Sequence, residues 1–106
     1  MKYISVQALH LALSEDPNFQ LIDVRELYEY QICKLPSQHI PMAEIPSRVK
    51  EIDAAKSVCV MCKSGKRAAA VANLLETDYG FTDVWVVDGG IIAYAEQIDP
   101  NLEIYP

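Results

Sequence analysis

A chain of 106 residues is long enough for one compact domain and too short for two, so we expect residues 1–106 to form a single domain. Hydrophobic residues make up 51% of the chain, so a core can form without stabilisation by disulfide bonds or bound metal ions. A net charge of −6 argues against a general nucleic-acid binder, which needs a basic face.

Apolar runs bounded by turn residues predict strands, and apolar residues spaced by three and four predict helices. Strands are expected at residues 3–4, 20–24, 38–40, 57–61 and 83–87. Helices are expected after the N-cap residue Ser5, after Glu26, from Pro46 to Ile52, after the loop that begins at Cys62 and after Gly89-Gly90. Because strands alternate with helices, the sequence predicts an α/β fold with a mostly parallel five-stranded sheet flanked by helices on both faces.

The loop Cys-Lys-Ser-Gly-Lys-Arg joins the clearest strand to the clearest helix. Cys62 is therefore expected to present an exposed thiol at the carboxyl end of a strand, beside a helix N-terminus that favours negative charge. The thiolate is the nucleophilic form of cysteine, so Cys62 is predicted to be the catalytic residue rather than a structural cysteine. The rest of the predicted anion-binding loop is Lys63, Ser64, Gly65, Lys66 and Arg67.

Neither of the other cysteines fits this chemistry as well. In an extended strand, about 10 Å would separate the Cα atoms of Cys59 and Cys62, whereas a disulfide needs them within about 7 Å. Cys59 is therefore predicted to belong to the core, and Cys33 to be a bystander for which a resolving role stays open. His10 and His39 show no zinc-finger spacing with the cysteines, so neither a metal nor an organic cofactor is expected.

Several segments, in this order, resemble the rhodanese-domain sulfurtransferases. Residues 62–67 resemble the family's Cys-x-x-Gly-x-Arg active loop, and residues 21–26, 39–41 and 87–91 resemble its Asp-Val-Arg, His-Ile-Pro and Gly-Gly segments. Residues 32–36 look like the C-terminal rhodanese domain of adenylating enzymes of the molybdopterin and thiamine sulfur pathways. The chain departs from the common pattern at Met42, Ala68 and Tyr94, and none of these departures removes the nucleophile or the loop glycine.

The resemblance implies a rhodanese-like fold and a sulfurtransferase that moves sulfane sulfur from a donor such as thiosulfate through a Cys62 persulfide. Asp23 and Arg25 are expected to support the loop, with a substrate contact of Arg25 left open. Arg67 is expected to hold the loop through hydrogen bonds to carbonyl groups, with substrate binding as the alternative, and His39 is expected to be structural. Related phosphatases and arsenate reductases have a seven-residue loop, so the six-residue loop favours sulfur over phosphate.

The expected partners are a small sulfur donor, either thiosulfate or a persulfide, and a sulfur-carrier protein as a candidate acceptor, with no nucleic acid and no membrane. An odd number of cysteines and the lack of a signal-peptide pattern at the N-terminus favour a cytoplasmic protein. Two alternatives stay open. One is a non-catalytic rhodanese-like binding or regulatory module, and the other is a phosphatase or arsenate reductase.

Overall fold

The computed structural model describes residues 1–106, and its strands form one five-stranded sheet in the order β1-β5-β4-β2-β3. The strands are β1 (Lys2–Ile4), β2 (Gln20–Asp23), β3 (Gln38–His39), β4 (Val58–Met61) and β5 (Val84–Val87). Every pair of neighbouring strands is parallel. The predicted α/β fold is confirmed, and the sheet is wholly parallel rather than mostly so.

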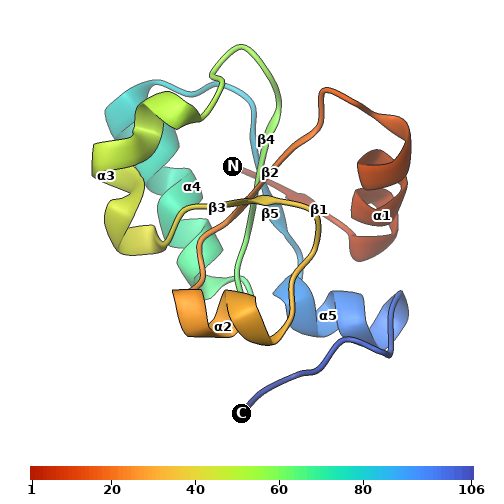
Figure 1. Cartoon of the computed structure of the whole chain (residues 1–106). Helices are drawn as coiled ribbons and strands as arrows, with labels where there is room; N and C mark the ends of the chain where they lie inside the picture. The colour runs from red at the N-terminus through yellow and green to blue at the C-terminus, as the bar shows by residue number, and fades with distance from the viewer.

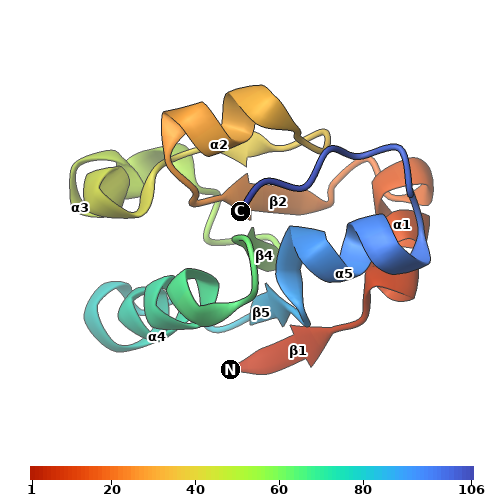
Figure 2. The ribbon, with the colours of Figure 1, turned by 90° about the horizontal axis from the view of Figure 1, so that it is seen from below.

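The helices are α1 (Val6–Glu15), α2 (Leu27–Ile32), α3 (Ile45–Arg48), α4 (Lys66–Tyr79) and α5 (Gly90–Gln97). Helices cover both faces of the sheet, as Figure 2 shows with α3 and α4 on one side and α1 and α5 on the other. The prediction of one helix from Pro46 to Ile52 was wrong. The 3-10 turns η1 (Met42–Glu44) and η2 (Val49–Glu51) flank a four-residue α3, and Ile52 takes an extended backbone that places its side chain in the core.

Alternation along β4 divides the core into two layers. Val58 and Val60 pack on the side of α3 and α4, whereas Cys59 and Met61 pack on the side of α1 and α5. Cys62 continues the alternation and joins the α3–α4 layer. Cys59 and Cys62 therefore belong to opposite layers, and all three cysteines are free thiols.

The parallel sheet gathers the carboxyl ends of its strands at one edge, where α2 and the beginning of α5 also lie (Figure 1). Asp23 ends β2, Cys62 follows β4, and the Gly89-Gly90 turn follows β5. Ligands of open parallel sheets bind at this edge. None of the helices has the length and hydrophobicity that a membrane-spanning segment needs.

Candidate active site

The sulfur of Cys62 accepts hydrogen bonds from two backbone N–H groups. The N–H groups of Gly65 and Ala68 donate to Cys62 Sγ at 3.0 Å and 3.3 Å. The expected exposed thiol is instead recessed, since the residue is only 1% exposed. The loop closes around the sulfur, so that the amides at the beginning of α4 point at it. Such donors stabilise a negative charge on sulfur.

Two local features shape this loop. Gly65 has a φ of +114° and is the N-cap of α4, a backbone conformation that favours glycine. On the outer side of the loop, the first turn of α5 holds the carbonyl groups, because Ile91 N–H donates to the Cys62 oxygen at 3.0 Å and Ile92 N–H donates to the Lys63 oxygen at 3.2 Å. While the carbonyl groups of Cys62 and Lys63 bond to α5, the N–H groups of Gly65 and Ala68 face the sulfur.

Arg67 connects the loop to α2. Its guanidinium donates to both carboxylate oxygens of Glu29, at 2.6 Å and 2.9 Å. The expectation that Arg67 bonds to carbonyl groups of the loop was therefore wrong, because a buried carboxylate on α2 offers a stronger, charged acceptor. The guanidinium of Arg67, helped by the Tyr105 hydroxyl and the Glu26 N–H, lowers the pKa of Glu29 to about 2.

The Glu29–Arg67 ion pair should make stability depend on pH. The folded-state pKa of Glu29, about 2, lies below its ordinary value of 4.5, so its contribution is full above pH 4.5 and is lost as the pH falls toward 2. Allowing for the partial exposure of Arg67, Glu29→Gln should lower the free energy of unfolding by about 2 kcal/mol at pH 7. Urea unfolding at pH 7 and pH 3 should show this deficit shrinking at the lower pH. Glu26→Gln is the matched control, and a deficit that is equal at both pH values would contradict the ion-pair account.

Asp23 and Arg25 form a second ion pair, which is fully buried. Arg25 donates to the Asp23 carboxylate from Nε at 3.0 Å and from Nη2 at 2.8 Å, and Nη2 also donates to the Cys33 carbonyl at 2.7 Å. Nη1 donates to the Tyr105 hydroxyl at 3.1 Å. Each guanidinium nitrogen of Arg25 therefore has a protein partner, and the group links β2, the end of α2 and the segment after α5 that carries Tyr105.

Sequence reasoning missed two residues of this network, Glu29 and Tyr105. Tyr105 donates its hydroxyl hydrogen to Glu29 Oε2 at 2.5 Å, and its ring lies 4.7 Å from the Lys63 ammonium. Burial, followed by the Glu29 carboxylate, raises the pKa of Tyr105 to about 12, which keeps the hydroxyl a donor at neutral pH. Glu29 had a faint local signal, because Glu26 and Glu29 have the spacing of a helix-capping pair. Tyr105 had none.

The site therefore consists of a cysteine in an anion-binding nest, on a loop of six residues from Cys62 to Arg67, at the carboxyl edge of a parallel sheet. Comparison with protein families gives a match of the rhodanese-like domain to residues 5–97. The chain belongs to the rhodanese-like domain family.

The relatives of this rhodanese-like domain include sulfurtransferases. Putative sulfurtransferase YtwF of Bacillus subtilis (strain 168) is 35% identical over 95% of this chain and 97% of that protein. Rhodanese-like/PpiC domain-containing protein 12, chloroplastic, of Arabidopsis thaliana is 37% identical over 99% of this chain. The crystal structure of a rhodanese-like domain protein from Staphylococcus aureus matches with a TM-score of 0.82 and 31% identity over 100% of both chains.

The predicted similarity to adenylating enzymes is also confirmed. Adenylyltransferase and sulfurtransferase UBA4 of Debaryomyces hansenii is 32% identical over 96% of this chain. The chain spans only 25% of that protein and 38% of the Arabidopsis protein. Those relatives are therefore much longer proteins that contain a similar rhodanese-like domain.

The lysines of the rhodanese-like loop differ in their surroundings. Lys66 and Ser64 are exposed, whereas Lys63 is half-buried. Neither Lys63 nor Lys66 forms an ion pair with a carboxylate.

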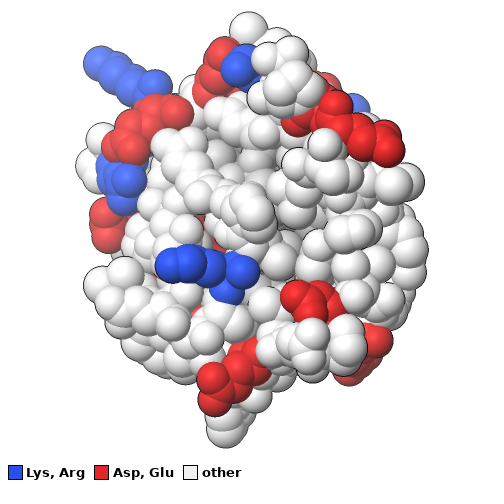
Figure 3. Space-filling view, turned by 45° about the vertical axis from the view of Figure 1, so that its right-hand side comes forward, with Lys and Arg blue, Asp and Glu red and all other residues white.

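On the face of the rhodanese-like domain seen in Figure 3, basic side chains form small separate groups with acidic ones around the margin.

The other predicted residues lie around this site without entering the nest. His39 Nε2 lies 2.7 Å from the Arg25 carbonyl oxygen, and its ring stacks on that of Tyr30 at 4.3 Å between centroids. Burial raises the pKa of the Cys59 thiol to about 12, which makes it an unreactive core residue. Cys33 is buried with its sulfur 3.9 Å from Arg25 Nη1.

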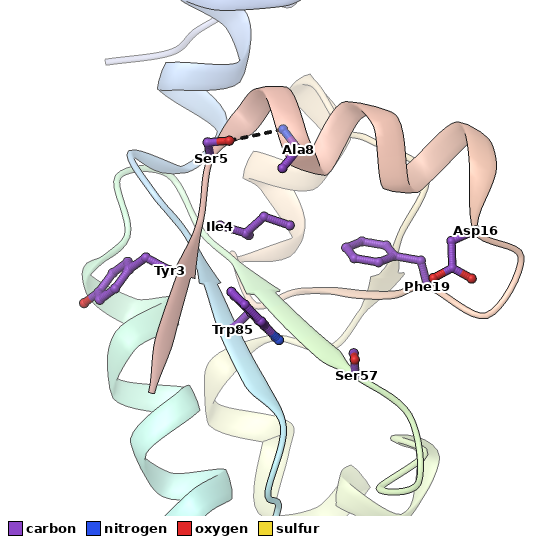
Figure 4. A pocket seen from close by; sticks show the side chains of 8 residues that line it. All are labelled: Tyr3, Ile4, Ser5, Ala8, Asp16, Phe19, Ser57 and Trp85. Carbon is purple, nitrogen blue, oxygen red and sulfur yellow. Dashed lines mark hydrogen bonds between the residues drawn. The ribbon is translucent and has the colours of Figure 1, made fainter.

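No three His, Cys, Asp or Glu side chains lie close enough together to hold a metal ion in this rhodanese-like domain. The one pocket, of about 480 Å³, does not adjoin the nest. Figure 4 shows its lining at the beginning of α1 and beside β1 and β5, with Ile4, Phe19 and Trp85 directed into the same space. Phe19 and Ser57 precede β2 and β4, whereas Cys62 follows β4, so the pocket extends toward the opposite edge of the sheet.

Proposed function

We propose that this chain is a sulfurtransferase that moves sulfane sulfur from a donor such as thiosulfate to a thiophilic acceptor through a persulfide on Cys62. The observation that carries the proposal is the pair of N–H groups, from Gly65 and Ala68, directed at Cys62 Sγ. They stabilise both the attacking thiolate and the terminal sulfur anion of a persulfide. Residues 1–106 act as one catalytic domain in this proposal.

In the first half-reaction, the Cys62 thiolate attacks the outer sulfur of thiosulfate. A bond forms between Sγ and that sulfur, and the sulfur–sulfur bond of thiosulfate breaks, with sulfite leaving with the electron pair. In the second half-reaction, an acceptor nucleophile attacks the terminal sulfur of the persulfide, and the Cys62 thiolate leaves. Two half-reactions that share a covalent intermediate give ping-pong kinetics.

The charges around the loop favour anionic donors. Arg67 is neutralised by Glu29, whereas Lys63 and Lys66, in the same loop as Cys62, have no carboxylate partner. Unpaired cations at the mouth of a site raise the local concentration of an anion.

The Bacillus subtilis relative YrkF, 30% identical over 76% of this chain, is described as a putative sulfur carrier protein. We therefore propose a sulfur-carrier protein as the cellular acceptor. We also propose the cytoplasm as the compartment, because the three cysteines are free thiols.

The assay that separates the candidate functions uses the unmodified protein with thiosulfate and cyanide. Thiocyanate should form, and plots of reciprocal rate against reciprocal thiosulfate concentration at several cyanide concentrations should be parallel. A generic aryl phosphate should not be turned over. Hydrolysis of the aryl phosphate without thiocyanate formation would favour the phosphatase, and turnover of neither substrate would favour a binding module.

A further inference from the structure

The segment after α5 packs across the site edge of the domain. Figure 2 shows it running back from the end of α5 toward α2 and β2. Leu102 and Tyr105 are partly buried and pack against the core layer beneath α1 and α5. This tail therefore has a defined place, with Tyr105 between α2 and the Cys62 loop.

Both ends of the Tyr105 side chain make contacts in the site. The hydroxyl donates to Glu29 and accepts from Arg25, at 2.5 Å and 3.1 Å. These two charged partners fix the direction of the ring. The ring then lies 4.7 Å from the ammonium of Lys63, the residue that follows the nucleophile. Such a contact is a cation–π interaction.

Lys63 depends on this contact for its position. A lysine side chain loses about 2 kcal/mol of rotamer entropy when it is held in one place, and Lys63 has no carboxylate partner to hold it. We propose that Tyr105 is a positioning residue that holds the ammonium of Lys63, the residue next to Cys62 in the loop, and so makes the site selective for anionic sulfur donors. The role in donor selection rests on the proposed sulfurtransferase function.

Selectivity for charge can be measured without any sulfur transfer. Iodoacetate and iodoacetamide differ in charge but are nearly equal in size, so the ratio of their alkylation rates at Cys62 reports the local field on an approaching anion. The fraction of Cys62 present as thiolate and the access of a reagent to its sulfur affect both alkylation rates equally, so they cancel in the ratio. Because a partly exposed cation–π contact contributes modestly, Tyr105→Leu should lower the iodoacetate-to-iodoacetamide ratio about two- to fivefold. The KM for thiosulfate should rise by a similar factor at unchanged kcat.

The controls show whether Tyr105 acts through Lys63. Tyr105→Phe keeps the ring but loses the hydroxyl contacts to Glu29 and Arg25 that fix its direction, so its ratio should lie between those of the unmodified protein and Tyr105→Leu. Tyr3→Leu, at an exposed tyrosine of the distant pocket, should leave the ratio unchanged. In a Lys63→Gln background, Tyr105→Leu should have no further effect. An unchanged ratio in Tyr105→Leu, or an equal fall in the Lys63→Gln background, would overturn the proposal.

Two further results keep the test decisive. If Tyr105→Leu does not fold, Lys63→Gln is the deciding variant. Its iodoacetate-to-iodoacetamide ratio should fall at least about two- to fivefold, and an unchanged ratio would overturn the proposal. If the unmodified protein transfers no sulfur, the proposed function fails, whereas the alkylation ratio still tests the role of Tyr105.

Discussion

Cys62→Ser should lower kcat/KM for thiosulfate by at least about a thousandfold, because a serine hydroxyl is far less acidic and less nucleophilic than a thiol and cannot carry the sulfur. The fold should survive, since the hydroxyl has the same two N–H donors, from Gly65 and Ala68, within reach. Thiocyanate formation by purified variants is the measurement.

The matched controls for Cys62→Ser are Cys59→Ala and Cys33→Ala. Both residues are buried outside the nest, so each variant should keep turnover within a few-fold of the unmodified protein once its stability has been checked. Turnover that persists in Cys62→Ser, or that vanishes in Cys33→Ala, would move the nucleophile away from Cys62.

Gly90→Ala should be the most destabilising of the glycine substitutions. A Cβ at position 90 would overlap the Lys63 carbonyl group and lie 2.6 Å from the Cys62 carbonyl oxygen, at a φ of +61°. The left-handed backbone costs about 1–2 kcal/mol, and forcing the loop backbone aside costs about 1–3 kcal/mol more. We expect a loss of about 2–5 kcal/mol in the free energy of unfolding, measured with urea, together with slower sulfur transfer because the loop that surrounds Cys62 must shift.

Gly80→Ala is the control for that substitution. Gly80 also has a left-handed φ, +72°, but no atom lies within 4 Å of the position that a Cβ would take there. The variant should therefore lose only the backbone cost of about 1–2 kcal/mol and keep its activity. Equal losses in the two variants would show that the contact between the Gly89-Gly90 turn and the Cys62 loop does not matter.

The parts of the molecule that the sequence predicts well are those encoded over short stretches. Apolar spacing predicted the buried face of α4, where Ala68, Val71, Ala72 and Leu75 all reach the core. The run that ends at Cys62 predicted β4 and the loop in the same way. The length of an extended strand also separated Cys59 from Cys62. The spacing of apolar residues and the turn residues between them are enough to predict such features.

The parts that the sequence did not predict depend on contacts between distant segments. Arg67 and Glu29 lie 38 residues apart, and Glu29 and Tyr105 lie 76 residues apart. Only the packing of α2 and the tail at the carboxyl edge of the sheet brings them together. The burial of Cys62 is of the same kind, because it follows from how the loop closes against α5. The supporting network of the site is therefore a tertiary property.

The persulfide on Cys62 is the central claim, and an intact mass measured after incubation with thiosulfate tests it most directly. The unmodified protein should gain the mass of one sulfur atom, a thiol reductant should remove that gain, and Cys62→Ser should show none. A protein without the adduct, or an adduct that survives in Cys62→Ser, would contradict the account.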